Sequence, residues 1–326
     1  MTIAVLPPTW RQIQKNNFKK WTELVSFLEL NQEQSSKILK KCRFPLNLPY
    51  RLAAKIEKKT LDDPILKQFL PVTDETMEDE NFSRDPVGDR KALCSPKLLH
   101  KYHGRVLLVT TSSCAMHCRY CFRRHFDYEV ERKDFEPEIE SIRHDPTVKE
   151  VILSGGDPLS LSNVALRTLI SQIDEIPHVT KLRFHTRFPI GIPERIDEEF
   201  LEIIENSRLK VWFVIHSNHP RELDKDLFAY LNRLQRNGVT VLNQAVLLAG
   251  INDNVDTLTE LCEKLVDHGV VPYYLHQLDR VAGATHFEVP IEKGKRMIEE
   301  LKRVLPGYAV PRYVKEVPGE AYKVEI

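Results

Sequence analysis

The sequence has no long hydrophobic run and no net charge, and each absence argues against a class of protein. Its longest apolar runs, such as Val211 to Ile215, suit buried strands, whereas a membrane-spanning helix needs about 20 apolar residues. Lys and Arg number 47, as do Asp and Glu, so overall charge does not favour a nucleic-acid partner. The N-terminus, MTIAVLPPTWRQ, lacks the basic-then-apolar pattern of a secretory signal. We therefore expect a cytoplasmic protein with no membrane or nucleic-acid partner.

Cysteines are also few, six in 326 residues, and their spacing is uneven. A disulfide scaffold is typical of small secreted chains, and this chain is neither small nor evidently secreted. Cys42, Cys94 and Cys262 stand alone, and we expect them to be buried thiols because free cysteine packs like a small hydrophobic residue. The other three lie within eight residues, so they are candidates for shared chemistry.

A strand–helix period begins at about Arg105. The preceding region predicts helices and irregular segments, and 1–103 is taken as a helical N-terminal region. Strands alternating with helices predict an α/β fold, here a partial (β/α)6 TIM-like barrel over 104–304 with chemistry at the carboxyl ends of its strands, followed by a short tail over 305–326. An open doubly wound sheet is the alternative, less favoured because polar clusters follow nearly every strand. The apolar, β-branched runs that predict the six strands begin near Val106, Val151, Leu182, Val211, Val241 and Val270.

The segment CAMHCRYC directly follows the first predicted strand and has the spacing CxxxCxxC. Iron–sulfur clusters are normally held by four thiolates, so Cys114, Cys118 and Cys121 would leave one iron free to bind S-adenosylmethionine (SAM). A zinc site completed by a histidine, His117 or His125, is one alternative, but no second CxxC pair is present. An electron-transfer cluster is another, but Cys262 lies far away in a predicted helix. The motif resembles that of the radical SAM superfamily, which implies a [4Fe-4S] cluster and SAM.

Two further fragments fit SAM binding. Ser154, Gly155, Gly156 and Asp157 end the second strand and resemble the glycine-rich segment of the same superfamily. Glycines allow the backbone to approach a ligand closely, although Gly-Gly is also common in a tight turn between a strand and a helix. His216, at the end of the fourth strand, is either a SAM contact or a packed histidine.

A more specific resemblance covers about two-thirds of the chain. It is carried by RVLLVTTSSCAMHCRYCFRR, ILSGGDPL, LNQAVLLAGIND, YYLHQLDRVAGATHF and GYAVPRYVKEVPGEAYK. Together these segments are similar to the lysine 2,3-aminomutase family, and most of all to the bacterial branch that supplies β-lysine for modifying elongation factor P. The resemblance implies a second cofactor, pyridoxal 5′-phosphate (PLP), and migration of the α-amino group of L-lysine to the β-carbon.

The family pattern also implies how PLP is held. Lys323 matches the lysine that binds PLP as a Schiff base, although Glu320, Ala321 and Tyr322 replace small residues usual in that segment. The PLP phosphate is expected to contact three residues, namely Arg105, Lys101 and Gln244. At the second of these positions the family carries arginine, so a point charge replaces a bidentate fork.

Substrate contacts follow from the same resemblance. Arg123 is expected to pair with the carboxylate of lysine, whereas Asp279 and Glu316 are expected to surround its ε-ammonium, with Glu316 replacing an aspartate. Burying either charge of the substrate without a partner would be costly. Two acids at these positions favour lysine over an acidic amino acid.

Partners are implied in the same way. We expect a functional link to elongation factor P and its lysyl ligase, and a protein that supplies the reducing electron. We also expect a monomer or weak homodimer, because longer family members carry a C-terminal extension associated with assembly, whereas only three residues follow Lys323 here. Two alternatives to the elongation factor role stay open. One is the same reaction on free lysine for catabolism or osmolyte synthesis, and the other is a PLP-independent iron–sulfur protein that transfers electrons or activates another enzyme.

Overall fold

The computed structural model describes residues 7–128 and 132–326, and its centre is a ten-stranded sheet. Neighbouring strands in this sheet follow one another along the chain, and β3 to β9 run parallel to one another. The edge strands β1, β2 and β10 are antiparallel. The strands are β1 (Leu93–Ser95), β2 (Leu98–Tyr102), β3 (Arg105–Val109), β4 (Glu150–Ser154), β5 (Lys181–Thr186), β6 (Lys210–His216), β7 (Thr240–Val246), β8 (Val271–His276), β9 (Arg312–Lys315) and β10 (Val324–Glu325).

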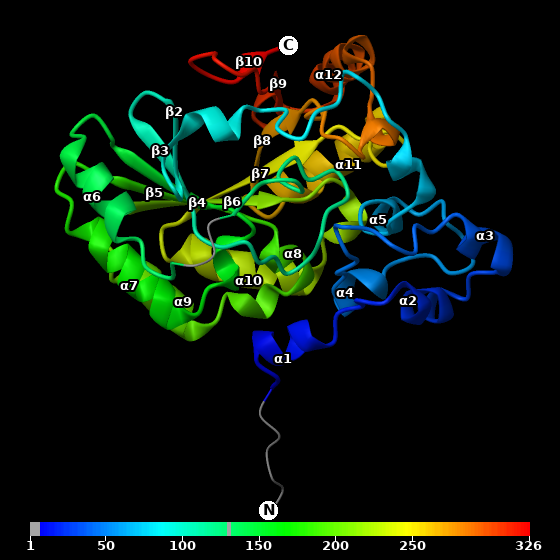
Figure 1. The fold of residues 1–326 in the computed structure, drawn as a ribbon, viewed down its shortest axis with the longest axis horizontal. Coiled ribbons are helices and arrows are strands. Elements are labelled where there is room, and N and C mark those ends of the chain that lie inside the picture. The colour runs from blue at the N-terminus through cyan, green and yellow to red at the C-terminus, as the bar shows by residue number, and fades with distance from the viewer. Residues whose placement is uncertain (1–6, 129–131) are drawn as a thin grey trace, which may run out of the picture.

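Helices follow the parallel strands and lie along the outer side of the curved sheet (Figure 1). Side-chain caps start several of them, as where Ser162 accepts a hydrogen bond from the backbone of Ala165 at the start of α7. Five shorter helices precede the sheet. The helices are α1 (Trp10–Lys15), α2 (Trp21–Leu28), α3 (Gln32–Ser36), α4 (Tyr50–Ala53), α5 (Pro64–Lys67), α6 (Glu136–His144), α7 (Asn163–Asp174), α8 (Phe188–Gly191), α9 (Glu198–Glu205), α10 (Lys225–Arg236), α11 (Val255–Val266) and α12 (Ile291–Val304).

The two faces of the sheet differ in character. Val106, Val151, Leu182 and Val211 occupy one row across β3 to β6, and each is at least nine-tenths buried. Successive side chains of a strand point to opposite faces, so Arg183, which follows Leu182 on β5, points to the other face of the sheet. Apolar side chains therefore anchor the sheet to its helices, and the opposite face is free to carry polar groups.

The predicted α/β fold with a partial barrel is confirmed. Each of the six expected strands is present as β3 to β8, and the chain returns through a helical segment between them. Four strands were not expected, because β1, β2, β9 and β10 are only two to five residues long and have no period of their own. Backbone hydrogen bonds to neighbouring strands, rather than a local sequence pattern, make these segments strands. They extend the sheet into residues 93–102 and into the tail after residue 305.

The N-terminal region packs against one side of the barrel (Figure 1). The Trp10 ring meets the Phe188 ring edge-on at 5.5 Å between centroids. Asn17 donates a hydrogen bond of 2.7 Å from Nδ2 to the carbonyl of Ala115, in the loop after β3. Among the described residues, none of the helices combines the length and the apolar character needed to cross a bilayer.

A buried ion triad makes the firmest polar contact between this region and the loop after β3. Arg119 donates to the Glu75 carboxylate from Nε at 2.7 Å and from Nη2 at 2.5 Å, and Arg124 Nη2 donates to it at 2.6 Å. All three side chains are at least nine-tenths buried. Burial raises the pKa of Glu75, but the two guanidinium groups outweigh it and hold the pKa below its ordinary value.

We expect Glu75→Gln to lower the free energy of unfolding by about 3–5 kcal/mol at pH 7, because two buried guanidinium groups lose their anion. The folded-state pKa of Glu75 is depressed, so its contribution is present above the ordinary pKa of about 4.3 and is lost as the pH falls through the lower folded value. The difference between wild type and variant should therefore shrink in acid. Urea denaturation across pH measures it.

The matched control is Glu29→Gln, which removes an exposed partner of Lys58 and should change stability little. Equal losses in the two variants would contradict the importance of the buried triad.

Candidate functional site

The three cysteines of the CxxxCxxC motif lie in the segment between β3 and α6, just past the carboxyl end of β3. Cys114, Cys118 and Cys121 are each partly buried. Burial, with a smaller effect from the neighbouring Cys118, raises the pKa of Cys121 to about 11. Burial also raises the pKa of Cys114, with smaller effects from Asp157 and from the other two thiols. The three sulfur atoms are therefore close enough to interact electrostatically at the edge of the sheet where barrel chemistry is expected.

Backbone contacts from the N-terminal region hold this loop. Asn47 donates from Nδ2 to the carbonyl of Cys114 at 3.2 Å, and the carbonyl of Asn47 accepts the backbone N–H of His117 at 3.0 Å. Asn17 Nδ2 in turn donates to Asn47 Oδ1 at 2.8 Å. Two buried asparagines thus position the first turn of the motif.

The histidines considered as zinc ligands make other contacts. His117 Nδ1 lies 2.8 Å from the carbonyl of Pro45, and its ring stacks on Phe44. His125 Nε2 lies 3.0 Å from the carbonyl of Ala282. Over residues 7–128 and 132–326, no three His, Cys, Asp or Glu side chains converge on a single metal ion. A cubane differs from zinc in that each thiolate binds its own iron, so three spaced thiols suit a cluster with one open iron.

The lone cysteines do not complete the site. Cys262 is buried in α11, as expected, and burial raises its pKa to about 12. Cys42 is only partly buried, and Cys94 on β1 is exposed. The expectation of three buried thiols was therefore wrong for Cys94, because β1 is a short edge strand that leaves one face open.

The glycine pair after β4 packs directly against the backbone of the cysteine loop. Gly155 has a φ of +120°, and a Cβ on it would come 2.7 Å from the carbonyl oxygen of Thr111. A Cβ on Gly156 would come 2.3 Å from that of Ser113. The backbone N–H of Gly156 donates to Thr111 at 2.6 Å. The glycines are needed for this close approach, whether or not they also contact SAM.

Both carboxylate oxygens of Asp157 accept hydrogen bonds from within the protein. Its Oδ1 accepts from the Thr186 hydroxyl at 2.7 Å and from the backbone of Leu159 at 3.0 Å. Its Oδ2 accepts from the backbone of Arg187 at 2.8 Å and of Phe188 at 3.0 Å. Burial nevertheless raises its pKa to about 6. Two donors on each oxygen make Asp157 a support of the turn after β5. Its expected contact with SAM stays a prediction.

His216 and Gln244 were expected to serve different cofactors, yet they lie side by side. They are register partners on β6 and β7, and their Nε2 atoms are 2.7 Å apart. Burial, with a smaller effect from Arg187, lowers the pKa of His216 to about 3, so its ring is neutral and accepts the amide hydrogen of Gln244. The expected SAM and PLP contacts thus meet between two neighbouring strands.

Lys323 lies in a group of opposite charges at the end of the tail. Glu316 accepts hydrogen bonds from Lys323 Nζ, from the Tyr102 hydroxyl at 2.6 Å and from Lys101 Nζ at 3.4 Å. Burial raises the pKa of Glu316, but Lys323, the Tyr102 hydroxyl and Lys101 together outweigh it and hold the pKa below its ordinary value. Lys101 was expected at the PLP phosphate. It lies beside Glu316, the carboxylate that was predicted to bind the ε-ammonium of the substrate. Arg105, the other expected phosphate contact, stacks on the Tyr102 ring at 4.7 Å.

Asp89 is a site residue that the sequence analysis missed. Its buried carboxylate pairs with Arg123 Nε at 2.7 Å and with Lys101 Nζ at 2.7 Å. Arg123 also donates from Nη1 to Ser154 at 3.1 Å. Arg123 thus shares the Asp89 carboxylate with Lys101, which also contacts Glu316. Asp89 lies among other charged residues in the sequence SRDPVGDR, and no local pattern there distinguishes it from Asp85.

Asp279 is placed near the same charges but is not bonded to them. Within the described parts of the chain, its carboxylate forms no ion pair or side-chain hydrogen bond. Burial, opposed by Lys323 and assisted by Glu316, raises its pKa to about 7. The predicted pair of acids is therefore brought together with Lys323, one acid engaged and the other unpaired.

Two histidines on the inner face of the sheet were also missed. His185 on β5 and His276 on β8 each have a buried Nε2 without a hydrogen-bond partner. Burial lowers the pKa of both, and Lys323 contributes to each shift. Lys323 is thus within electrostatic reach of the barrel interior, and unpartnered ring nitrogens there leave polar contacts available to a ligand.

Comparison with known proteins agrees with this geometry. Residues 108–265 match the model of the Radical SAM superfamily, whose members use a [4Fe-4S] cluster and SAM. The chain is 40% identical to an L-lysine 2,3-aminomutase of Escherichia coli, covering 93% of this chain and 90% of that protein. It is 35% identical to one of Clostridium subterminale, covering 97% of this chain and 77% of that protein.

Among solved structures, a radical SAM methyltransferase from Sphaerobacter thermophilus is similar over 67% of this chain and 68% of its own, with 16% identity and a TM-score of 0.48. The relatives, the cysteine loop and the barrel lead to one assignment. This chain belongs to the lysine 2,3-aminomutase family of radical SAM enzymes, which are intramolecular aminomutases.

Proposed function

We propose that the protein converts L-lysine to β-lysine and that the product serves the modification of elongation factor P. One observation carries the choice of substrate. The unpaired carboxylate of Asp279 lies near Lys323 and Glu316, where an additional cation would relieve its raised pKa. The ε-ammonium of lysine is such a cation, and the relatives named L-lysine 2,3-aminomutase support the same substrate.

The residues of this chain divide the work by charge. Arg123, whose partner Asp89 is also bound by Lys101, would hold the carboxylate of lysine. Asp279 and Glu316 would hold the ε-ammonium and so fix the distance between the two ends of the substrate. With both ends held, the α- and β-carbons are presented to the interior of the barrel in one orientation.

The cofactors fit the side chains that remain. Cys114, Cys118 and Cys121 would hold the cluster, and the glycines after β4 bring the backbone close to where SAM would bind. Lys323 would hold PLP covalently, with Arg105 and Gln244 near its phosphate. When bound, the cluster and SAM supply radical initiation and PLP stabilises the unpaired electron while the amino group moves.

The product test is anaerobic incubation of reconstituted protein with SAM, PLP, dithionite and L-lysine, followed by chromatography of the amino acids. We expect β-lysine from wild type and none from Cys118→Ala, because a three-thiolate site has no spare ligand. Cys262→Ala is the matched control and should stay active, since this thiol lies in α11. SAM cleavage without any lysine product would instead favour an activating or electron-transfer role.

The role in elongation factor P modification needs a cellular readout. In a bacterium lacking its own aminomutase but retaining the lysyl ligase, expression of this chain should restore β-lysylated elongation factor P, measured by intact-protein mass. β-Lysine formation without that modification would point to free-lysine metabolism.

Lys323→Ala should abolish borohydride trapping of PLP while the iron content stays at the wild-type level, because the two sites use separate residues. Lys315→Ala, on β9 of the same tail, is the control and should trap PLP normally. Peptide mapping that finds PLP on Lys101, the other lysine beside Glu316, would refute the assignment.

Asp279→Asn should weaken lysine binding roughly a hundredfold, about 3 kcal/mol, because the ε-ammonium loses a partly buried anionic partner. A lysine titration followed through PLP absorbance measures this, and Glu316→Gln should act in the same direction.

The pH dependence of lysine binding tests the role of the Asp279 carboxylate independently. Since the pKa of Asp279 is about 7, the carboxylate becomes neutral below that pH, and wild-type affinity should fall in acid. Asp279→Asn should lose this pH dependence, and unchanged affinity in both variants would remove the acids from the site.

A further inference from the structure

One cysteine of the motif is contacted by a buried cation that the function described above does not use. Arg187 follows β5 and caps the start of α8. Its Nη1 donates to Cys118 Sγ at 2.9 Å, and its side chain is 6% exposed. An arginine guanidinium is not deprotonated in proteins, so Arg187 places a fixed positive charge beside this sulfur.

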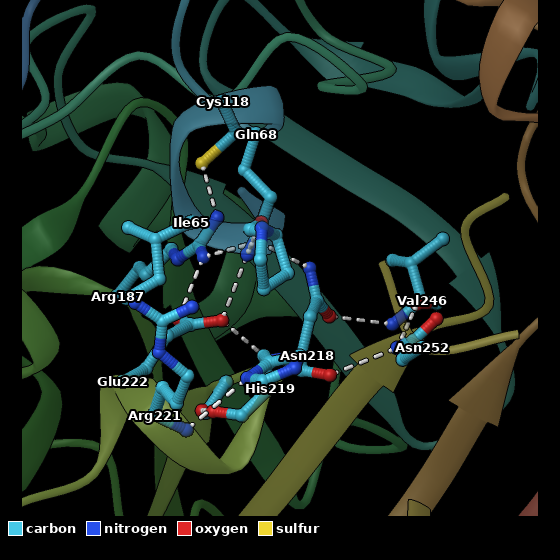
Figure 2. Close-up of polar contacts among 12 residues, drawn as sticks. Ile65, Gln68, Cys118, Arg187, Asn218, His219, Arg221, Glu222, Val246 and Asn252 are labelled. Atoms are coloured by element: carbon cyan, nitrogen blue, oxygen red, sulfur yellow. Dashed lines mark hydrogen bonds and ion pairs between the residues drawn. The ribbon is translucent and has the colours of Figure 1, made fainter. Parts of the chain in front are cut away.

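The position of this guanidinium is held from the side away from the sulfur. Arg187 Nη2 donates to Glu222 Oε2 at 2.8 Å and to Gln68 Oε1 at 2.7 Å, and both partners are fully buried. Figure 2 shows Arg187 between Cys118 and Glu222. The backbone N–H of Arg187 is bound by Asp157. Side chain and backbone are therefore both fixed.

A wider set of hydrogen bonds makes the arrangement rigid. Glu222 Oε1 accepts from Gln68 Nε2 at 3.0 Å and from the backbone of Asn218 at 3.1 Å. Asn218 in turn accepts from the backbone of Val246 at 2.8 Å and from Asn252 Nδ2 at 3.0 Å. These bonds link the loops after β6 and β7 to the cysteine loop (Figure 2). Moving the guanidinium would break several buried bonds at once.

Cys118, Arg187 and Glu222 form a row in which a cation lies between a cluster ligand and an anion. This arrangement affects the reduction potential of a bound cluster. When a one-electron donor reduces a cluster, no bond forms or breaks, and the cluster gains one negative charge. Hydrogen bonds and cations beside ligating sulfurs stabilise that charge and raise the reduction potential. Glu222, behind the guanidinium, opposes the effect.

Resting on the cluster assigned in the proposed function, we propose that Arg187 raises the reduction potential of the cluster through Cys118 and that Glu222 moderates it. Arg187 and Glu222 are positioning residues, since they act through the cysteine. A less negative reduction potential makes electron transfer from an electron-carrier protein to the cluster more favourable.

Redox titration of the reconstituted protein, followed by the electron paramagnetic resonance signal of the reduced cluster, tests the inference. Arg187→Gln should make reduction at least tenfold less favourable, a potential about 59 mV more negative for one electron. Arg187→Lys keeps the charge and should lie nearer to wild type. Glu222→Gln should shift the potential in the positive direction, and the double variant Arg187→Gln/Glu222→Gln should shift less than Arg187→Gln alone.

Arg195→Gln is the matched control. Arg195 is also a buried arginine, but it donates to the backbone carbonyls of Leu159 and Leu161, so its loss should leave the potential unchanged. A merely structural role would move the two single variants in the same direction, whereas the electrostatic role gives opposite signs.

Shifts of the same sign, or a wild-type potential in an iron-loaded Arg187→Gln, would overturn the inference. If Arg187→Gln does not retain iron, the isosteric Glu222→Gln decides, and only a positive shift supports the inference. Failure of the proposed function is separate, because it would appear as a wild-type protein without a reducible cluster or without β-lysine formation.

Discussion

The buried carboxylate of Glu75 is the contact on which the shape of the cysteine loop most depends. The loop has little regular secondary structure, so no ladder of backbone hydrogen bonds holds it. Glu75 binds Arg119 and Arg124, which flank Cys121, and so ties the motif to the N-terminal region. Such a triad is costly to assemble and more costly to break. It fixes the loop because Glu75 belongs to the N-terminal region, whereas both arginines belong to the loop itself.

The glycines after β4 complete this support from the opposite side. Gly155 and Gly156 lie where any side chain would collide with the backbone of the loop. Asp157, the next residue, binds the turn that begins α8 and with it the backbone of Arg187. A short segment thus connects the shape of the loop to the cation beside Cys118. This explains how the N-terminal region, three strand ends and a buried arginine combine into one rigid centre.

At the other end of the site, charges are shared rather than paired one to one. Lys101 contacts both Asp89 and Glu316, and Glu316 also binds Lys323. Asp279 is left without a partner in the described chain, and its pKa is raised to about 7. A site with one unpaired acid beside a lysine is prepared for an added cation, which is the physical basis for the substrate proposed above.

Local pattern by itself determined the strands β3 to β8, the position of the cysteine motif and the strand ends that carry His216, Gln244 and Asp279. It could do so because burial imposes a period on the residues of a strand or helix, and because metal chemistry imposes a spacing on cysteines. Only the tertiary structure decided which charges meet. Strands β1, β9 and β10 exist through pairing with neighbours, and Asp89 and Arg187 acquire their roles from residues far away in the chain. A buried ion pair depends on distance in space, and sequence separation does not encode that distance.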